Sequence, residues 1–188
     1  MNSVTAQRNR SWSKRSYNID SRLSVTLALN MVNSSGDYPF GFIKTPKAMA
    51  FNTPITLIFD YRLNQWFSIT TDVSNNKWKA NQGIISGQVV KKDVPYFSSN
   101  IGINIYLDNF FIDDSIQNNF EFFIQPTVGY FKTDKGSYSI NMGFGASIWI
   151  TKAVAVSGIV QNKWMYKKTN SKYSRSHQQL IVGIKHLF

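Results

Sequence analysis

The chain has no cysteine, only two histidines and few acidic residues. Without cysteine, a disulfide framework and a cysteine-ligated metal site are both excluded. Across its 188 residues no apolar run approaches the roughly 20 residues that a membrane-spanning helix needs. The chain has 10 acidic residues and 21 Lys and Arg residues, so the net charge is +11. The length fits one domain, and the charge indicates an anionic partner: nucleic acid, acidic lipid or a phosphorylated surface.

Apolar side chains alternate with polar or small ones along eight segments, while helical periodicity is nearly absent. Because successive side chains of a strand point to opposite faces, this pattern predicts strands with one apolar row each. The expected strands are 21–33, 54–63, 67–73, 96–107, 120–133, 138–150, 153–166 and 180–188. Pro126 falls inside the fifth strand, where we expect a bulge, because proline is normally confined to edges and bulges.

The connections between these strands differ in length. They are long (34–53), tight (63–66), long (74–95), medium (108–119), short (134–137), tight (151–152) and medium (167–176). Outer-membrane barrels alternate short periplasmic turns with longer outer loops. We therefore predict an all-β, eight-stranded antiparallel up-and-down transmembrane barrel with both termini in the periplasm. The fourth connection is long for a periplasmic turn.

A soluble sandwich or a lipocalin-like barrel is the competing architecture, because alternation alone does not tell inside from outside. Glycines on the proposed lumen face favour the membrane barrel, since small residues let a narrow lumen fill. They are Gly102, Gly129, Gly143, Gly145 and Gly183. The aromatic content of 15% also suits a barrel with girdles at both rims. We expect Tyr61, Trp66, Phe67, Phe120 and Phe188 at the inner rim and Phe51, Trp78, Tyr96, Tyr130, Tyr138, Trp164 and Tyr166 at the outer.

Several short motifs carry a family resemblance, in particular Asn141-Met-Gly-Phe-Gly-Ala-Ser-Ile-Trp149 together with the terminal strand that ends at Phe188. Tyr61-Arg-Leu-Asn-Gln-Trp-Phe67 and Gln125-Pro-Thr-Val-Gly-Tyr130 add to it. From about residue 17 onward the chain resembles the eight-stranded OmpA-type outer-membrane barrel of Bacteroidetes. The resemblance implies that Phe188 is a C-terminal insertion signal. We expect residues 17–188 to form the barrel without a peptidoglycan-binding domain, and 1–16 to be a flexible segment left from a signal cleavage region.

No catalytic or metal-binding motif stands out. Phosphate-loop, dinucleotide and metal-loop patterns are missing, so we expect no cofactor and no metal. Asp108, Asp113 and Asp114 lack the spacing of a calcium loop, and we interpret them as part of a solvated periplasmic turn. A hydrolase or acyltransferase at the outer rim would have to draw on Asp72, Asp93, Asp134 and His177. We expect a protein that is not an enzyme, with His186 on the lipid face.

Charged residues of both signs fall on the lumen face. Because buried charges are tolerated when paired, we predict an ion-pair plug rather than a selectivity lining. Its members are Arg22, Asp60, Arg62, Glu121 and Lys185, with Asp72 further up.

Basic residues concentrate in the predicted outer loops and at the N-terminus. Lys77, Lys79, Lys167, Lys168, Lys172 and Arg175 are candidate contacts for lipopolysaccharide, with Lys163, Lys91 and Lys92 on the same rim. We expect no nucleic acid, which an outer-membrane barrel does not meet. The function most consistent with the sequence is a structural barrel or a subunit of an outer-membrane assembly. A narrow pore is the alternative.

Overall fold

The computed structural model describes residues 22–34, 49–82, 84–85, 88–111, 119–166 and 176–188. The predicted N-terminal segment and its cleavage region lie outside these residues. Eight long strands form the body of the molecule. They are β1 (Leu23–Asn33), β3 (Ile55–Arg62), β4 (Phe67–Trp78), β7 (Val94–Tyr106), β8 (Phe120–Lys132), β9 (Gly136–Trp149), β10 (Val154–Met165) and β11 (His177–Leu187).

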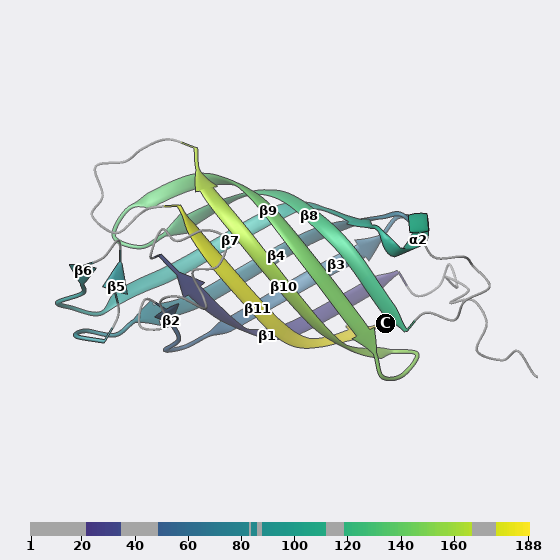
Figure 1. The fold of residues 1–188 in the computed structure, drawn as a ribbon, viewed down its shortest axis with the longest axis horizontal. Helices are drawn as coiled ribbons and strands as arrows, with labels where there is room; N and C mark the ends of the chain where they lie inside the picture. The colour runs from purple at the N-terminus through teal and green to yellow at the C-terminus, as the bar shows by residue number, and fades with distance from the viewer. Residues whose placement is uncertain (1–21, 35–48, 83, 86–87, 112–118, 167–175) are drawn as a thin grey trace, which may run out of the picture.

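The long strands form one closed antiparallel sheet. They pair in the order β11-β10-β9-β8-β7-β4-β3-β1, and β11 also pairs with β1. Ten consecutive residue pairs close the barrel, from Ser24 with Leu187 to Asn33 with Gln178. Figure 1 shows the strands crossing the barrel at a steep tilt, as closure of a sheet requires. The predicted eight-stranded barrel is confirmed.

Four short elements lie at the two ends of the barrel. β2 (Met49–Ala50) and the hairpin β5 (Ile84–Ile85) and β6 (Gln88–Val89) lie at one end. The helix α2 (Asp108–Phe111) lies at the other end, where the C-terminus is also found (Figure 1). Within the described residues no helix is long and apolar enough to cross a membrane. We call the two ends the hairpin end and the C-terminal end.

The apolar row of each strand faces outward, as the prediction of a membrane barrel requires. Leu27 is 64% exposed and Phe144 is 59% exposed, while Thr26, next to Leu27, and Gly143, next to Phe144, are buried inside. Phe59, Ile103 and Val156 are exposed in the same way. The barrel therefore has an apolar outer surface and a lumen of mostly polar side chains.

The third strand is longer than the sequence suggests. β4 runs to Trp78, and β7 begins at Val94, so the connection is 79–93 rather than 74–95. Ser74 and Asn76 continue the inward row, while Asn75 and Lys77 on the outer row end the apolar pattern. The loss of apolar side chains at this point marks the edge of the apolar band and not the end of the strand.

The bulge expected at Pro126 is absent, and that prediction is wrong. The register between β7 and β8 is the same on both sides of Pro126, because Gly102 pairs with Thr127 and Ile105 pairs with Ile124. No extra residue is inserted. The ladder skips the two intervening pairs, while Pro126 stays in register with Met142 of β9. The missing proline N–H is accommodated by a gap in one ladder.

Candidate functional site

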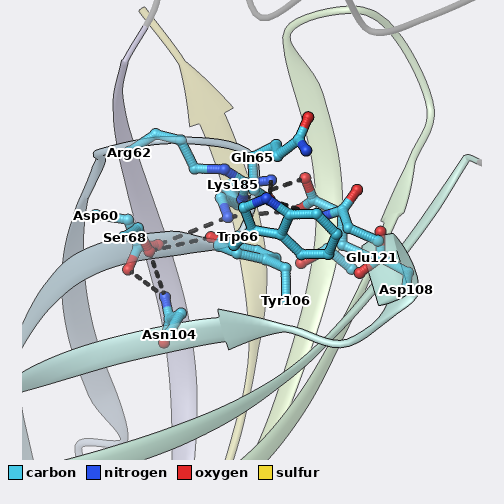
Figure 2. A network of polar contacts seen from close by, with 12 residues as sticks. Asp60, Arg62, Gln65, Trp66, Ser68, Asn104, Tyr106, Asp108, Glu121 and Lys185 are labelled. Carbon is cyan, nitrogen blue, oxygen red and sulfur yellow. Dashed lines mark hydrogen bonds and ion pairs between the residues drawn. The ribbon is translucent and has the colours of Figure 1, made fainter. Parts of the chain in front are cut away.

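The lumen at the C-terminal end holds a cluster of buried charges. Arg62 Nη1 lies 3.7 Å from Glu121 Oε1. Lys185 Nζ lies 3.6 Å from Asp60 Oδ2 and 3.8 Å from Glu121 Oε2. All four residues are less than 10% exposed. β3 and β8 are not neighbours, so the Arg62–Glu121 pair ties opposite walls of the barrel together across the lumen (Figure 2).

Arg62 is positioned by the turn that follows its own strand. Its Nε donates to the carbonyl of Asn64 at 3.1 Å, and its Nη2 donates to the carbonyl of Gln65 at 3.4 Å. Its guanidinium carbon lies 3.3 Å from the centre of the Tyr106 ring. Because a planar cation binds both a carboxylate and an aromatic face, an arginine suits this position better than a lysine would.

Polar side chains complete the surroundings of Asp60. Asn104 Nδ2 donates to Asp60 Oδ1 at 2.9 Å and lies 3.1 Å from Ser68 Oγ. Ser68 Oγ in turn lies 3.2 Å from the Tyr106 hydroxyl. Figure 2 shows these side chains converging beneath the turn that carries Gln65 and Trp66. The network therefore joins ion pairs to neutral hydrogen bonds, as a buried carboxylate requires.

Arg22 does not join this cluster. Its carbonyl accepts a hydrogen bond from Arg62 N at 2.8 Å, but its side chain forms no ion pair with any residue that the structure describes. The structure thus brings together four of the five residues that the sequence groups, Asp60, Arg62, Glu121 and Lys185.

Neutral polar side chains fill the middle of the lumen. Asn100 Nδ2 donates to Asp72 Oδ1 at 2.7 Å, and Asn141 Nδ2 donates to Asn100 Oδ1 at 3.0 Å. Gln161 Nε2 donates to Thr127 Oγ1 at 3.1 Å, and Asn141 binds the same hydroxyl. Gly145 leaves the space that the Phe123 ring occupies, because a Cβ there would collide with that ring. The lumen is therefore filled by side chains at this level.

The lumen at the hairpin end is closed by a hydrophobic cluster, which we call the aromatic cap. It consists of Val32, Ala50, Trp78, Ile85, Val90, Val94, Tyr96 and Phe131. The prediction that Trp78 and Tyr96 belong to the outer aromatic girdle is wrong, because both side chains are buried inside. Their positions continue the inward rows of β4 and β7, so alternation, and not the girdle rule, decides their direction.

Lys163 and His177 lie under the aromatic cap. His177 Nε2 lies 2.8 Å from the Tyr96 hydroxyl, and the Phe131 ring packs 4.7 Å away. Lys163 is fully buried, and its Nζ donates to Ser98 Oγ at 3.0 Å. The prediction that Lys163 belongs to the basic outer rim is therefore wrong. It shares the inward row of β10 with Gln161.

The loop between β4 and β7 covers this end of the lumen. Ile85 and Val90 from the loop are part of the aromatic cap. Asp93 fastens the loop, because its Oδ2 lies 3.1 Å from Lys77 Nζ and its Oδ1 accepts a hydrogen bond from Ala80 N. These two donors, first the Ala80 amide and then Lys77, hold the pKa of Asp93 below its usual value.

The remaining candidates are distributed over separate places. Lys79 is exposed beside the Asp93 contact, while Lys167, Lys168, Lys172 and Arg175 lie outside the described residues. Asp72 contacts Asn100, His177 contacts Tyr96, and Asp134 accepts a hydrogen bond from Thr133. None of these three contacts joins His177 to a carboxylate. Among the described residues, no group of three or more histidines and carboxylates is arranged to hold a metal ion. His186 lies on the outer face, against Phe188.

No protein-family model matches the chain, and no curated protein matches it. Solved structures of similar fold do exist. Neisserial surface protein A shares 15% identity, with a TM-score of 0.58 over 89% of this chain and 97% of that one. The chain has the fold of an outer-membrane β-barrel. The N-terminal β-barrel domain of Pseudomonas aeruginosa OprF (8% identity, TM-score 0.53) matches 89% of this chain and 99% of its own. The Yersinia pestis outer membrane protein Ail in a phospholipid bilayer nanodisc (10% identity, TM-score 0.53) matches 90% and 100%.

Proposed function

We propose that the chain is a non-enzymatic outer-membrane barrel with a closed lumen, serving as a structural protein or as a subunit of an outer-membrane assembly. One observation carries the proposal. Side chains occupy the lumen at three levels: ion pairs at the C-terminal end, amides and hydroxyls in the middle, and the aromatic cap at the hairpin end. An eight-stranded barrel is about wide enough for side chains alone. The apolar outer surface and the similarity in fold to membrane barrels support the location.

Planar-bilayer recording tests the closed lumen. We expect no steady open channel for the wild type. A variant that trims both ends, Arg62→Ala with Trp78→Ala, should conduct more than the wild type because it removes a cross-lumen contact and part of the aromatic cap. Ile103→Ala, on the outer face, is the matched control and should leave conductance unchanged. A large, stable wild-type conductance would instead establish the narrow pore, the runner-up function.

Arginine substitutions test the membrane location. At the bilayer midplane an arginine on the lipid face costs about 2–4 kcal/mol. We expect Leu27→Arg and Phe144→Arg to lower the free energy of unfolding in lipid by that amount. The exposed Lys132→Arg keeps its charge and is the control. If both apolar positions accept arginine without loss of stability, the outer surface does not face lipid.

We further propose that the C-terminal end is periplasmic and that the hairpin end faces outward, where basic residues bind the phosphates of lipopolysaccharide. The candidate contacts are Lys77, Lys79, Lys167, Lys168, Lys172 and Arg175. Lysine binds phosphate as a point charge, and exposed pairs weaken with salt. Lys77 is already paired with Asp93, so the other basic residues are the stronger candidates for phosphate contacts.

Co-purification of lipid tests this contact. Replacing Lys167, Lys168 and Lys172 with Gln should reduce bound lipopolysaccharide and lower the melting temperature in its presence. Lys152→Gln, in the turn between β9 and β10, removes a charge at the opposite end and should have no effect. If the triple variant keeps the same lipid and the same melting temperature, the basic rim does not bind lipopolysaccharide.

Kinship with the OmpA-type barrels of Bacteroidetes is part of this proposal and is supported by the short motifs alone.

A further inference from the structure

One side of the C-terminal end exposes a concentration of aromatic side chains, which we call the aromatic edge. It consists of the exposed Phe110, Phe111, Phe120 and Phe122 and the half-buried Trp66. Phe111 is 83% exposed and Phe110 is 55% exposed. Two neighbouring phenylalanines that are open to this degree are costly in water, because apolar surface of this size is normally removed from it.

The aromatic edge is held rigidly by the polar residues of α2. Asn109 Nδ2 donates to the Gln65 carbonyl at 2.6 Å, which ties α2 to the turn between β3 and β4. Asp108 Oδ1 accepts a hydrogen bond from Phe122 N at 3.1 Å, which ties it to β8. The Phe110 ring lies 4.3 Å from the Trp66 ring. The polar side chains of α2 thus form hydrogen bonds with the barrel, and the side chain of Phe111 is left exposed.

The aromatic edge is continuous with the apolar outer surface. Phe122 and Phe120 belong to the outward row of β8, and their rings stack with centres 6.4 Å apart. On the other side of α2, the outward row of β7 ends at Ile105, which pairs with the exposed Phe67 of β4. The outward apolar rows of β7 and β8 therefore end at the part of the barrel to which α2 is attached.

We propose that the aromatic edge inserts into the lipid leaflet at the C-terminal end, at the boundary between headgroups and acyl chains, and anchors the barrel there on one side. Tryptophan favours this boundary because its indole N–H can remain hydrated while the rest of the ring is buried, and phenylalanine is common on the apolar face of segments that lie in the interface. The proposal rests on the membrane location proposed above. It predicts that α2 lies against lipid rather than in free periplasmic water.

The absence of cysteine allows the proposal to be tested with single labels on the full chain. Phe111→Cys, Ile103→Cys and Lys91→Cys are each labelled with an environment-sensitive fluorophore and reconstituted in phosphatidylcholine–phosphatidylglycerol nanodiscs. Lipids with a nitroxide near the headgroup or near the end of the acyl chain serve as quenchers. All three positions are exposed, so the substitutions leave the folded barrel intact.

We expect the label at position 111 to emit at shorter wavelength than the label at 91 and to be quenched more by the headgroup nitroxide than by the deep one. The label at 103 should show the reverse preference. If the label at position 103 is quenched and the label at 111 behaves like the label at 91, the barrel is in the membrane but the aromatic edge is not. The aromatic edge would then be a docking surface for a periplasmic protein. If 103 is not quenched either, the membrane location itself is wrong.

Discussion

The two ends of the lumen are closed by different chemistry. At the C-terminal end, Arg62, Lys185, Asp60 and Glu121 satisfy one another across the barrel. At the hairpin end, a loop packs Ile85 and Val90 onto Trp78, Tyr96 and Phe131. A charge cluster loses much of its stability when one member is removed, because the others are left buried and unpaired, whereas an apolar cluster loses stability in proportion to the volume removed. A narrow barrel can therefore be closed either by pairing buried charges or by packing apolar side chains.

Removing one member of the charge cluster should have the largest effect. Glu121→Ala leaves Arg62 and Lys185 without a shared carboxylate, and we expect it to lower the free energy of unfolding by about 3–5 kcal/mol. Urea unfolding in detergent micelles measures the loss. Lys132→Ala removes an exposed charge from the same strand and should cost almost nothing. Equal losses for the two variants would show that the cluster contributes no special stability.

Trimming the aromatic cap should have a somewhat smaller effect. Trp78→Ala removes a buried indole, and we expect a loss of about 3 kcal/mol, at the lower end of the range for aromatic truncation, because the covering loop can settle into the space. Trp78→Phe should recover much of that stability, as expected where volume rather than charge matters. The same urea titration serves, and a phenylalanine variant as unstable as the alanine variant would contradict packing as the cause.

The hydrogen bond between Tyr96 of the cap and His177 beneath it should matter less. Tyr96→Phe removes the hydroxyl that contacts His177 Nε2, and we expect a loss of about 1 kcal/mol. The imidazole NMR signals of His177 should shift in this variant. His186, on the outer face, is the internal control and its signals should stay in place. Unchanged His177 signals would mean that the hydrogen bond does not form.

The smallest effect is expected at Asp93, whose side chain is exposed. Its pKa is lowered in the folded protein, so the stabilisation is present above the usual value of 3.8 and is lost as the pH falls through the folded pKa. Hydrogen exchange at the Ala80 amide, corrected for the intrinsic pH dependence, should lose protection over that interval. In Asp93→Asn the protection should be low at all pH values. A wild-type amide that stays protected below the folded pKa would show that Asp93 does not fasten the loop.

Alternation predicts the barrel and the direction of most side chains, and the wrong directions arise where residue type is ranked above alternation. Residue type places Trp78, Tyr96 and Lys163 at the rim, although each of them continues an inward row. The contacts that inward residues make with one another are harder to predict from the sequence. Glu121 and Lys185 lie on β8 and β11, which are not neighbours, so their contact depends on the curvature of the whole barrel. Tyr106 and Trp149, which lie beside the charges, carried no signal beyond their parity.

The proline in β8 makes the wall of the barrel uneven in strength. Ten pairs in a row join β1 to β11, whereas the ladder between β7 and β8 skips Ile103 and Asn104 on one side and Gln125 and Pro126 on the other. Local opening is easiest where the backbone hydrogen bonds within a ladder are interrupted. The junction that closes the barrel in space is therefore not its weakest seam. Breathing of the wall, and the entry of water or lipid between strands, should begin in the middle of the chain, beside Pro126.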